Sequence, residues 1–317
     1  MTKQNNKPYS LIFVGTPEYS VPTLEALIND ERFNVVAIIT APDAKIGRKQ
    51  IITPPPVKIT ALKNNIPALQ PAKLDANAYE EIKKINPDVI ITIAYGQIIP
   101  EKILNLPKHG CLNLHASLLP KYRGASPIQA AIKNNEQKTG VTLMKMDKGL
   151  DTGPILAREK IIIVKNETGE SLHDKLSELS AKTIIKYLPE YLLNNLKPQA
   201  QNNDLATLAP KITREDGRIN WNLSAKKIEH LARAYFPWPG IWTMWNDKIL
   251  KVNEVDSEIL KINKYQIGEI FEYQKTIAVQ CGQDSVIINK LQLQGKKTVE
   301  TKEFLRGYQS LLKAKLM

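Results

Sequence analysis

The sequence predicts an α/β fold, a doubly wound and mostly parallel sheet, with a second, smaller β domain after it. Three observations carry this prediction. Short apolar runs alternate with helical patterns in the first half of the chain, as parallel strands joined by crossover helices do. The chain has 317 residues, which suggests two domains at roughly 150 residues each. Beyond residue 211 the pattern changes to short β-type runs separated by turns.

The strands of the first domain are expected where apolar residues follow one another without alternation, because strands buried on both faces have this pattern. These runs are LIFVG (11–15), NVVAIIT (34–40), IPALQ (66–70), DVIITIAYG (88–96), CLNLHASLLP (111–120) and VTLMKM (141–146). Helices are expected at 18–29, 57–65, 77–86 and 171–196. The segment 41–56 is rich in proline and polar residues, and a loop of that length in a compact domain is usually functional or mobile.

Three segments follow from this pattern: a first domain at 1–196, a linker at 197–211 and a basic second domain at 212–317. The linker is polar and lacks periodicity. In the second domain, the runs IWTMW, KILKVNEV, YQIGEIFEY, TIAVQCG and SVIINKLQLQG predict a small barrel or sandwich. Its four tryptophans are expected in the core rather than as stacking platforms, and PWPG (237–240) is expected to be a structural turn. They are Trp221, Trp238, Trp242 and Trp245.

Composition narrows the functional class. The formal net charge of +12 favours a polyanionic partner, although an excess of lysine over arginine also arises by compositional drift, so charge alone leaves nucleic-acid binding open. Two cysteines, Cys111 and Cys281, cannot make a disulfide framework or a four-cysteine zinc site. No apolar run approaches the ~20 residues that span a bilayer. We therefore expect a soluble, cytoplasmic protein without a membrane partner.

Two motifs are excluded as carriers of function. The segment VGTPEYS follows the first strand, but it contains only Gly15 and lacks the G-x-G-x-x-G fingerprint of a dinucleotide site. The tripeptide at 151–153, Asp-Thr-Gly, matches an aspartic protease turn only superficially. Such a protease needs two carboxylates in one site, and this chain has one such motif.

An amide and an imidazole are expected on one face of the strand 111–120. Asn113 and His115 are two residues apart, and residues i and i+2 of a strand project to the same side. Ligands of open α/β sheets bind beyond the strand ends, and Asp151, in the loop MDKGLDTG (146–153), could reach the same edge. The three groups together would make a site for proton transfer and carbonyl polarisation. A pair of satisfied polar core residues is the alternative explanation of Asn-x-His alone.

Longer segments around these residues carry a family resemblance. NLHASLLPKYRGASPIQAAI and GLDTG, behind AYGQIIP, resemble the 10-formyltetrahydrofolate-dependent formyltransferases, and the methionyl-tRNA formyltransferase family among them. The resemblance extends from LIFVGTPEYS through TAPDAKIGR and TPPPVK to INW and FPWPG. The Asn-x-His pair with the aspartate marks the wider group, whereas the 41–56 loop and the second domain mark the branch that acts on tRNA.

The resemblance implies a Rossmann-like first domain, an OB-like second domain and roles for individual residues. The implied catalytic residues are Asn113, His115 and Asp151. The implied folate-binding residues are Ser117, Leu118, Leu119 and Pro120, with an apolar wall for the pterin at Ala94, Tyr95 and Gly96. The implied tRNA-sensing residue of the 41–56 loop is Arg48, and the second domain offers Lys211, Arg214, Arg218, Lys226, Lys227 and Arg233 for contacts with the tRNA backbone.

The implied reaction passes the formyl group of 10-formyltetrahydrofolate, a co-substrate, to the α-amine of initiator methionyl-tRNA. Asn113 and His115 would donate to the formyl oxygen, and Asp151 would orient His115 or take a proton from the amine. The sequence does not distinguish Asp151 from His115 as the base, and the reaction requires no metal. We expect a monomer. Two alternatives stay open: a formyltransferase for a small-molecule amine, and a tRNA-binding protein without catalysis.

Overall fold

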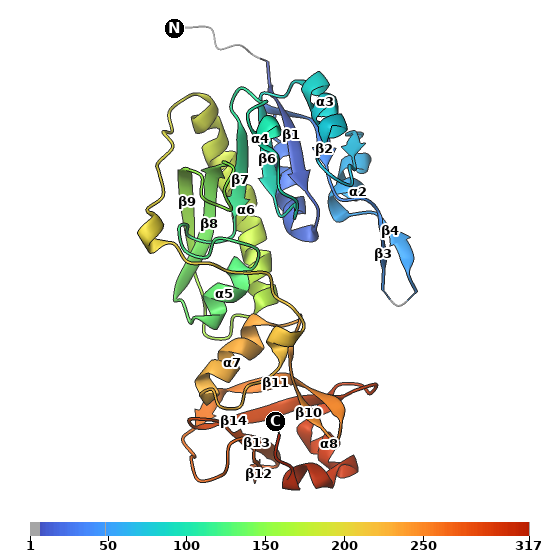
Figure 1. Ribbon diagram of the computed structural model, residues 1–317, viewed down its shortest axis with the longest axis vertical. Helices are drawn as coiled ribbons and strands as arrows, with labels where there is room; N and C mark the ends of the chain where they lie inside the picture. Colours follow the sequence, from blue (N-terminus) through green and yellow to red (C-terminus); the bar gives the residue numbers. More distant parts are fainter. Residues whose placement is uncertain (1–6, 48, 317) are drawn as a thin grey trace. The chain divides into compact units, whose positions relative to one another are not determined.

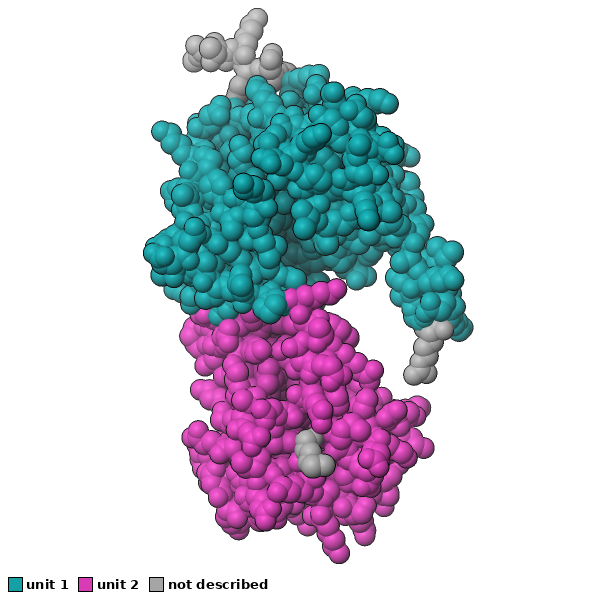
Figure 2. All heavy atoms as spheres, viewed as in Figure 1, with its two compact units in different colours: residues 1–127, 138–161, 173–210 teal, residues 128–137, 162–172, 211–317 magenta. Residues whose placement is uncertain are grey.

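The structure is a computed structural model that describes residues 7–47 and 49–316. The chain divides into two compact units, coloured separately in Figure 2. Unit 1 comprises residues 1–127, 138–161 and 173–210, and unit 2 comprises residues 128–137, 162–172 and 211–317. Within the described ranges, no helix combines the length and the apolar character needed to cross a bilayer.

A seven-stranded mixed sheet forms the centre of unit 1, in the order β5-β2-β1-β6-β7-β8-β9 (Figure 1). The strands are β1 Tyr9–Gly15, β2 Phe33–Ile39, β5 Ala68–Leu69, β6 Val89–Ile93, β7 Cys111–His115, β8 Lys138–Lys145 and β9 Ile155–Ile162. The pairs from β5 to β7 are parallel, and β8 joins β7 antiparallel. The doubly wound, mostly parallel sheet predicted from the sequence is confirmed. The chain leaves β1 in one direction for β2 and β5 and later in the other for β6 and β7, so the strand order reverses beside β1.

Helices pack on this sheet where the sequence provides apolar spacing and end signals. They are α1 Val21–Ile28, α2 Pro56–Lys63, α3 Ala76–Ile85, α4 Glu101–Leu104 and α6 Gly169–Leu192, of which residues 173–192 belong to unit 1. In α3, the Asp75 carboxylate caps the helix by accepting from the backbone N–H groups of Asn77 and Ala78. The helix ends at Asn86, whose φ of 51° lies in the left-handed region. Ile82 turns inward to a core that also contains Ile12 and Ile90.

The segment 41–56 contains a β-hairpin that was expected only as a loop. Strands β3 (Ala44–Ile46) and β4 (Ile51–Thr53) pair antiparallel. Three isoleucines of the hairpin are more than half exposed: Ile46 (58%), Ile51 (60%) and Ile52 (66%). Both faces of the hairpin lack a core, so the alternation of apolar and polar residues that signals a strand is missing. Arg48, the residue of this segment implied to sense tRNA, lies outside the described residues.

Unit 2 is built on a six-stranded antiparallel sheet in the order β10-β11-β14-β13-β12, with β15 paired to β14. The strands are β10 Ile241–Trp245, β11 Lys248–Leu260, β12 Ile270–Tyr273, β13 Thr276–Gln280, β14 Ser285–Leu293 and β15 Val299–Glu300. The helices are α5 Pro127–Lys133, of which residues 128–133 belong to unit 2, α7 Ala225–Ala234 and α8 Thr301–Gly307. Register shifts between β11 and β14 mark bulges, which let the long strand bend.

The tryptophans of unit 2 divide into two groups. Trp221, Trp242 and Trp245 are buried, at 4%, 7% and 7% exposure, so their expected place in the core is confirmed. For Trp238 the expected place in the core is wrong: it lies in the PWPG turn and is 58% exposed. The indole of Trp238 therefore lies on the surface of the turn and not in the core of unit 2.

Candidate active site

Strand β7 places Asn113 and His115 at one end of the sheet of unit 1. It lies between β6, parallel, and β8, antiparallel, so its backbone is held on both sides. Asn113 pairs with Thr92 of β6 and with Met144 of β8. The His115 side chain is 6% exposed, and Asn113 is partly buried. Both residues lie at the carboxyl end of a central strand, where open α/β sheets bind ligands.

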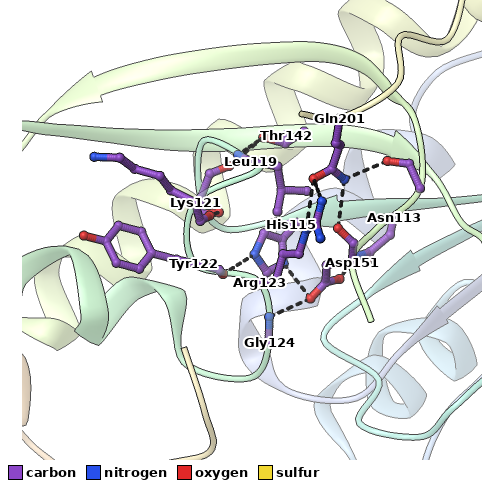
Figure 3. A network of polar contacts seen from close by, with 12 residues as sticks. Asn113, His115, Leu119, Lys121, Tyr122, Arg123, Gly124, Thr142, Asp151 and Gln201 are labelled. Atoms are coloured by element: carbon purple, nitrogen blue, oxygen red, sulfur yellow. Dashed lines mark hydrogen bonds and ion pairs between the residues drawn. The ribbon is translucent and has the colours of Figure 1, made fainter. Parts of the chain in front are cut away.

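The turn after β7 fixes the tautomer of His115. Its Nε2 atom lies 2.9 Å from the backbone carbonyl oxygen of Tyr122 (Figure 3). A carbonyl only accepts, so Nε2 carries a hydrogen and donates it. The other ring nitrogen, Nδ1, lies 3.6 Å from Oδ2 of Asp151. The imidazole thus has one nitrogen committed to the backbone and one directed at a carboxylate.

Thr142 of β8 holds the folded segment 117–122 in place. Its hydroxyl donates to the carbonyl of Ser117 at 2.6 Å and accepts from the N–H of Leu119 at 3.1 Å. The Ser117 hydroxyl donates to the carbonyl of Lys121 at 2.6 Å. Among the residues implied to bind folate, Ser117 and Leu119 are buried, and Leu118 and Pro120 are partly exposed. Of these four residues, only Leu118 and Pro120 therefore present surface to a ligand.

Asp151 reaches the site from the loop between β8 and β9. Its Oδ2 accepts from the N–H of Gly124 at 2.8 Å, and its Oδ1 accepts from Nδ2 of Asn113 at 3.4 Å. Its φ of 52° lies in the left-handed region, which is sparsely populated for residues other than glycine. Gly153 passes close to the backbone of β8, and a Cβ there would lie 1.9 Å from the carbonyl oxygen of Lys145. The loop is therefore tightly fitted at the aspartate, and the three predicted side chains meet.

Two side chains that the sequence analysis did not single out complete this network. Gln201 donates to the backbone carbonyls of Asp151 and Gly153 at 2.8 and 2.7 Å. Arg123 donates to the side-chain oxygen of Gln201 through Nε and Nη2, at 3.1 and 2.9 Å (Figure 3). Gln201 lies in the segment expected to be a linker. Polar residues without periodicity carry no sequence signal for such a contact.

The segment after β6 borders the same end of the sheet. Ala94 and Gly96 are exposed, and both have positive φ, 49° and 84°. A Cβ on Gly96 would meet nothing within 4 Å. Tyr95 is instead buried in the core, where burial raises the pKa of its phenol. Within the described part of the chain, the buried hydroxyls of Tyr95 and Thr92 have no hydrogen-bond partner. The open space beside Gly96 leaves room for a ligand at this end of the sheet.

The cationic residues implied to contact tRNA have different surroundings in unit 2. Lys211, Arg214 and Lys226 are exposed, and so is Arg218, whose guanidinium stacks on the ring of Trp242 at 5.9 Å. Arg233 forms an ion pair with Glu229 one helical turn away and donates to the carbonyl of Glu167 at 3.0 Å. Lys227 donates to the carbonyl of Lys133 at 2.8 Å, and burial lowers the pKa of its amine. Of the six implied residues, the ones exposed to solvent are thus Lys211, Arg214, Arg218 and Lys226.

Two family models match the chain, "Formyl transferase" over residues 10–188 and "Formyl transferase, C-terminal domain" over residues 211–309. The chain belongs to the formyl transferase family. A methionyl-tRNA formyltransferase of Caldicellulosiruptor saccharolyticus is 43% identical over 94% of this chain and 96% of that protein. One of Geobacter sulfurreducens is 42% identical over 94% and 93%.

The fold also occurs in solved structures of other proteins. An N-formyltransferase of Helicobacter canadensis, solved with folinic acid and dTDP-3-aminofucose, has a TM-score of 0.66 at 20% identity. The similarity covers 88% of this chain and 98% of that one. At this identity the likeness establishes the fold alone. In the described ranges, no group of three or more His, Cys, Asp or Glu side chains is arranged to hold a metal ion.

Proposed function

We propose that the chain transfers the formyl group of 10-formyltetrahydrofolate to the α-amine of initiator methionyl-tRNA. The convergence of Asn113, His115 and Asp151 at the end of β7 is the observation that carries the chemistry. The acceptor is supported by relatives named methionyl-tRNA formyltransferase, which are about as long as this chain and more than 40% identical to it. The +12 net charge fits a polyanionic acceptor.

The proposed reaction is an acyl transfer to nitrogen. The neutral amine attacks the formyl carbon, a new C–N bond forms, and the bond from that carbon to N10 of the folate breaks. The amine loses one proton, and N10 gains one. Asn113 has an amide hydrogen to donate to the formyl oxygen, where negative charge develops, and removing such a donor costs about 3–4 kcal/mol.

The contact between His115 and Asp151 supports a proposal for where the proton of the amine goes. Nε2 of His115 already carries a hydrogen bound to the Tyr122 carbonyl, so only Nδ1 has a free lone pair. Nδ1 and Oδ2 of Asp151, 3.6 Å apart, form the basic pair of the site. A proton held at Nδ1 converts this contact into an ion pair and is thereby stabilised. In this proposal His115 takes the proton, and Asp151 stabilises the imidazolium that forms.

The co-substrate supplies the activated formyl group. Its proposed contacts are Ser117, Leu118, Leu119 and Pro120 on one side and Ala94, Tyr95 and Gly96 on the other. The open space beside Gly96 supports this assignment. Because Ser117 and Leu119 are buried, the side chains proposed to contact the co-substrate directly are those of the partly exposed Leu118 and Pro120.

The proposed tRNA contacts lie mainly in the basic second domain, from residue 212 onward. Lys211, Arg214 and Arg218 are exposed and available to phosphates. Arg233 is engaged by Glu229, so it would contact tRNA only by exchanging that partner. Arg48 is proposed to contact the acceptor end. We further propose that the protein acts as a monomer in the cytoplasm, where its substrates are found.

Formylation of charged initiator tRNA tests the proposal. The protein is mixed with 10-formyltetrahydrofolate and methionyl-tRNA, and formylmethionine is detected by mass spectrometry after deacylation. Free methionine and a dTDP-linked amino sugar serve as alternative acceptors. His115→Ala is expected to abolish product, whereas His173→Ala, a matched change at a half-exposed histidine on α6, is expected to leave it. Product from the sugar and none from tRNA would overturn the proposed acceptor.

A further inference from the structure

Residues 197–210, named here the strap, pair with both loops that build the site. Gln199 exchanges two backbone hydrogen bonds with Ile155, at 2.8 and 2.7 Å, just beyond the aspartate loop. Further along, the N–H of Arg123 donates to the carbonyl of Thr207 at 2.8 Å, and the N–H of Ala209 donates to the carbonyl of Arg123 at 2.7 Å. The strap is thus fixed at two places, and Gln201 lies between them.

The amide of Gln201 is fully used and can face only one way. Its Nε2 donates to two carbonyl oxygens, those of Asp151 and Gly153, and these atoms cannot donate. Its Oε1 accepts two hydrogen bonds from Arg123, whose guanidinium cannot accept. The surroundings therefore require a donor at one end of the side chain and an acceptor at the other, as a primary amide provides.

Arg123 strengthens the hold of Gln201 on the loop. The residue is only 7% exposed, and Nη2 also donates to Oδ1 of Asn203 at 2.8 Å. Hydrogen bonds from a cation are stronger than those between neutral groups. Withdrawing electron density from the amide oxygen also makes the N–H groups of the same amide better donors. The buried guanidinium of Arg123 therefore polarises the amide of Gln201 and strengthens the hydrogen bond from that amide to the backbone carbonyl of Asp151.

Asp151 needs an external restraint. Its left-handed backbone conformation is unfavourable for a residue with a Cβ and persists where the surroundings enforce it. Its carboxylate must also keep the 3.6 Å contact with Nδ1 of His115 and the 2.8 Å bond with Gly124. A carbonyl anchored at residue 151 itself restrains the rotation that would turn the carboxylate away.

We propose that Gln201, oriented by Arg123, is a positioning residue that fixes Asp151 against His115. The proposal rests on the proposed function in one respect, the role of Asp151 in formyl transfer. It adds that the strap contributes to the rate of the chemical step and not to the binding of either substrate.

The test compares matched substitutions at Gln201 and Gln199 in the full chain. Gln199 is exposed and takes part in the strap only through its backbone, so Gln199→Glu and Gln199→Met are controls with the same chemistry. Gln201→Glu keeps the acceptor for Arg123 and loses both donors, and Gln201→Met loses all four bonds without adding charge. Both Gln201 variants are expected to lower kcat by about 10- to 100-fold with KM for both substrates unchanged, because a small misplacement of a reacting group has effects of this size.

A second measurement is independent of turnover. The chain has four histidines, and the imidazole ¹⁵N signals of His115 can be identified by comparison with His115→Ala. We expect Gln201→Met to shift the His115 signals and Gln199→Met to leave them in place. If the unmodified protein formylates no tRNA, the proposed function fails, and these spectra still test the positioning role.

Three outcomes overturn the inference. They are unchanged kcat in Gln201→Met, a rise in KM for tRNA at unchanged kcat, and His115 signals that do not move. If Gln201→Met does not fold, Gln201→Asn replaces it, since that amide keeps its polarity but is one methylene too short to span the four partners. Unchanged kcat and spectra in Gln201→Asn likewise overturn the inference.

Discussion

Replacing Asp151 by asparagine removes the charge beside His115 while keeping the side chain's size. Oδ2 lies 3.6 Å from Nδ1 of His115. At an effective dielectric constant of about 20, a carboxylate and an imidazolium at that separation attract by about 4–5 kcal/mol. If His115 is charged only while it holds the proton of the amine, most of this energy lowers the barrier. The expected loss is about 10³-fold in the rate of formyl transfer.

The assay is a single-turnover measurement with enzyme in excess over charged tRNA, so that product release does not mask the chemical step. Asp147→Asn in the same loop is the matched control: Asp147 is exposed, and an asparagine keeps the oxygen that accepts from Gly149 and Thr152. We expect the control to react at the unmodified rate. A rate for Asp151→Asn within about tenfold of the unmodified protein, below the usual effect of a positioned acid or base, would refute the assignment.

Three further predictions concern the core, the thiols and the acceptor. Phe13 is fully buried in β1, so Phe13→Ala should reduce the free energy of unfolding by about 3–5 kcal/mol in urea titrations, and a loss under 1 kcal/mol would contradict that packing. Burial raises the pKa of both Cys111 and Cys281 to about 12, so thiolates are scarce near pH 8. A thiol reagent should therefore modify neither cysteine in the folded protein and both cysteines in denaturant. Between roughly 50 and 200 mM salt, KM for tRNA should rise by about tenfold or more, and a flat profile would argue against phosphate contacts.

The sheet of unit 1 was predictable because its strands are buried on both faces. Leu11, Ile12 and Phe13 are all fully buried, and an unbroken apolar run is the sequence pattern expected of a strand that is covered on both faces. The same reasoning located β2, β6 and β7. It gave no signal for β9, in which only the first two residues are buried and the rest alternate between partly buried and exposed, or for the hairpin β3–β4, which has no buried face.

Part of the candidate site was also accessible from the sequence. Because Asn113 and His115 are two residues apart on a strand, their side chains project to the same face of the sheet. Asp151 lies in the loop directly after the next strand, so it could be expected near them. The tautomer of His115 was not accessible, because it depends on the path of the Tyr122 carbonyl. Gln201 was not accessible either, since only the tertiary hydrogen bonds of its amide distinguish it from the other polar residues of the strap.

The strap follows all three site residues in the sequence, so it is synthesised after them. A ribosome releases the N-terminal end of a chain first, and domains begin to fold as they emerge. A nascent chain synthesised only to the end of β9 already carries Asn113, His115 and Asp151, yet the residue whose amide would hold the aspartate, Gln201, has not been added. The centre for formyl transfer is therefore complete only once the strap has emerged, and a chain truncated before the strap would lack the bonds from Gln201 to the aspartate loop even with a folded sheet.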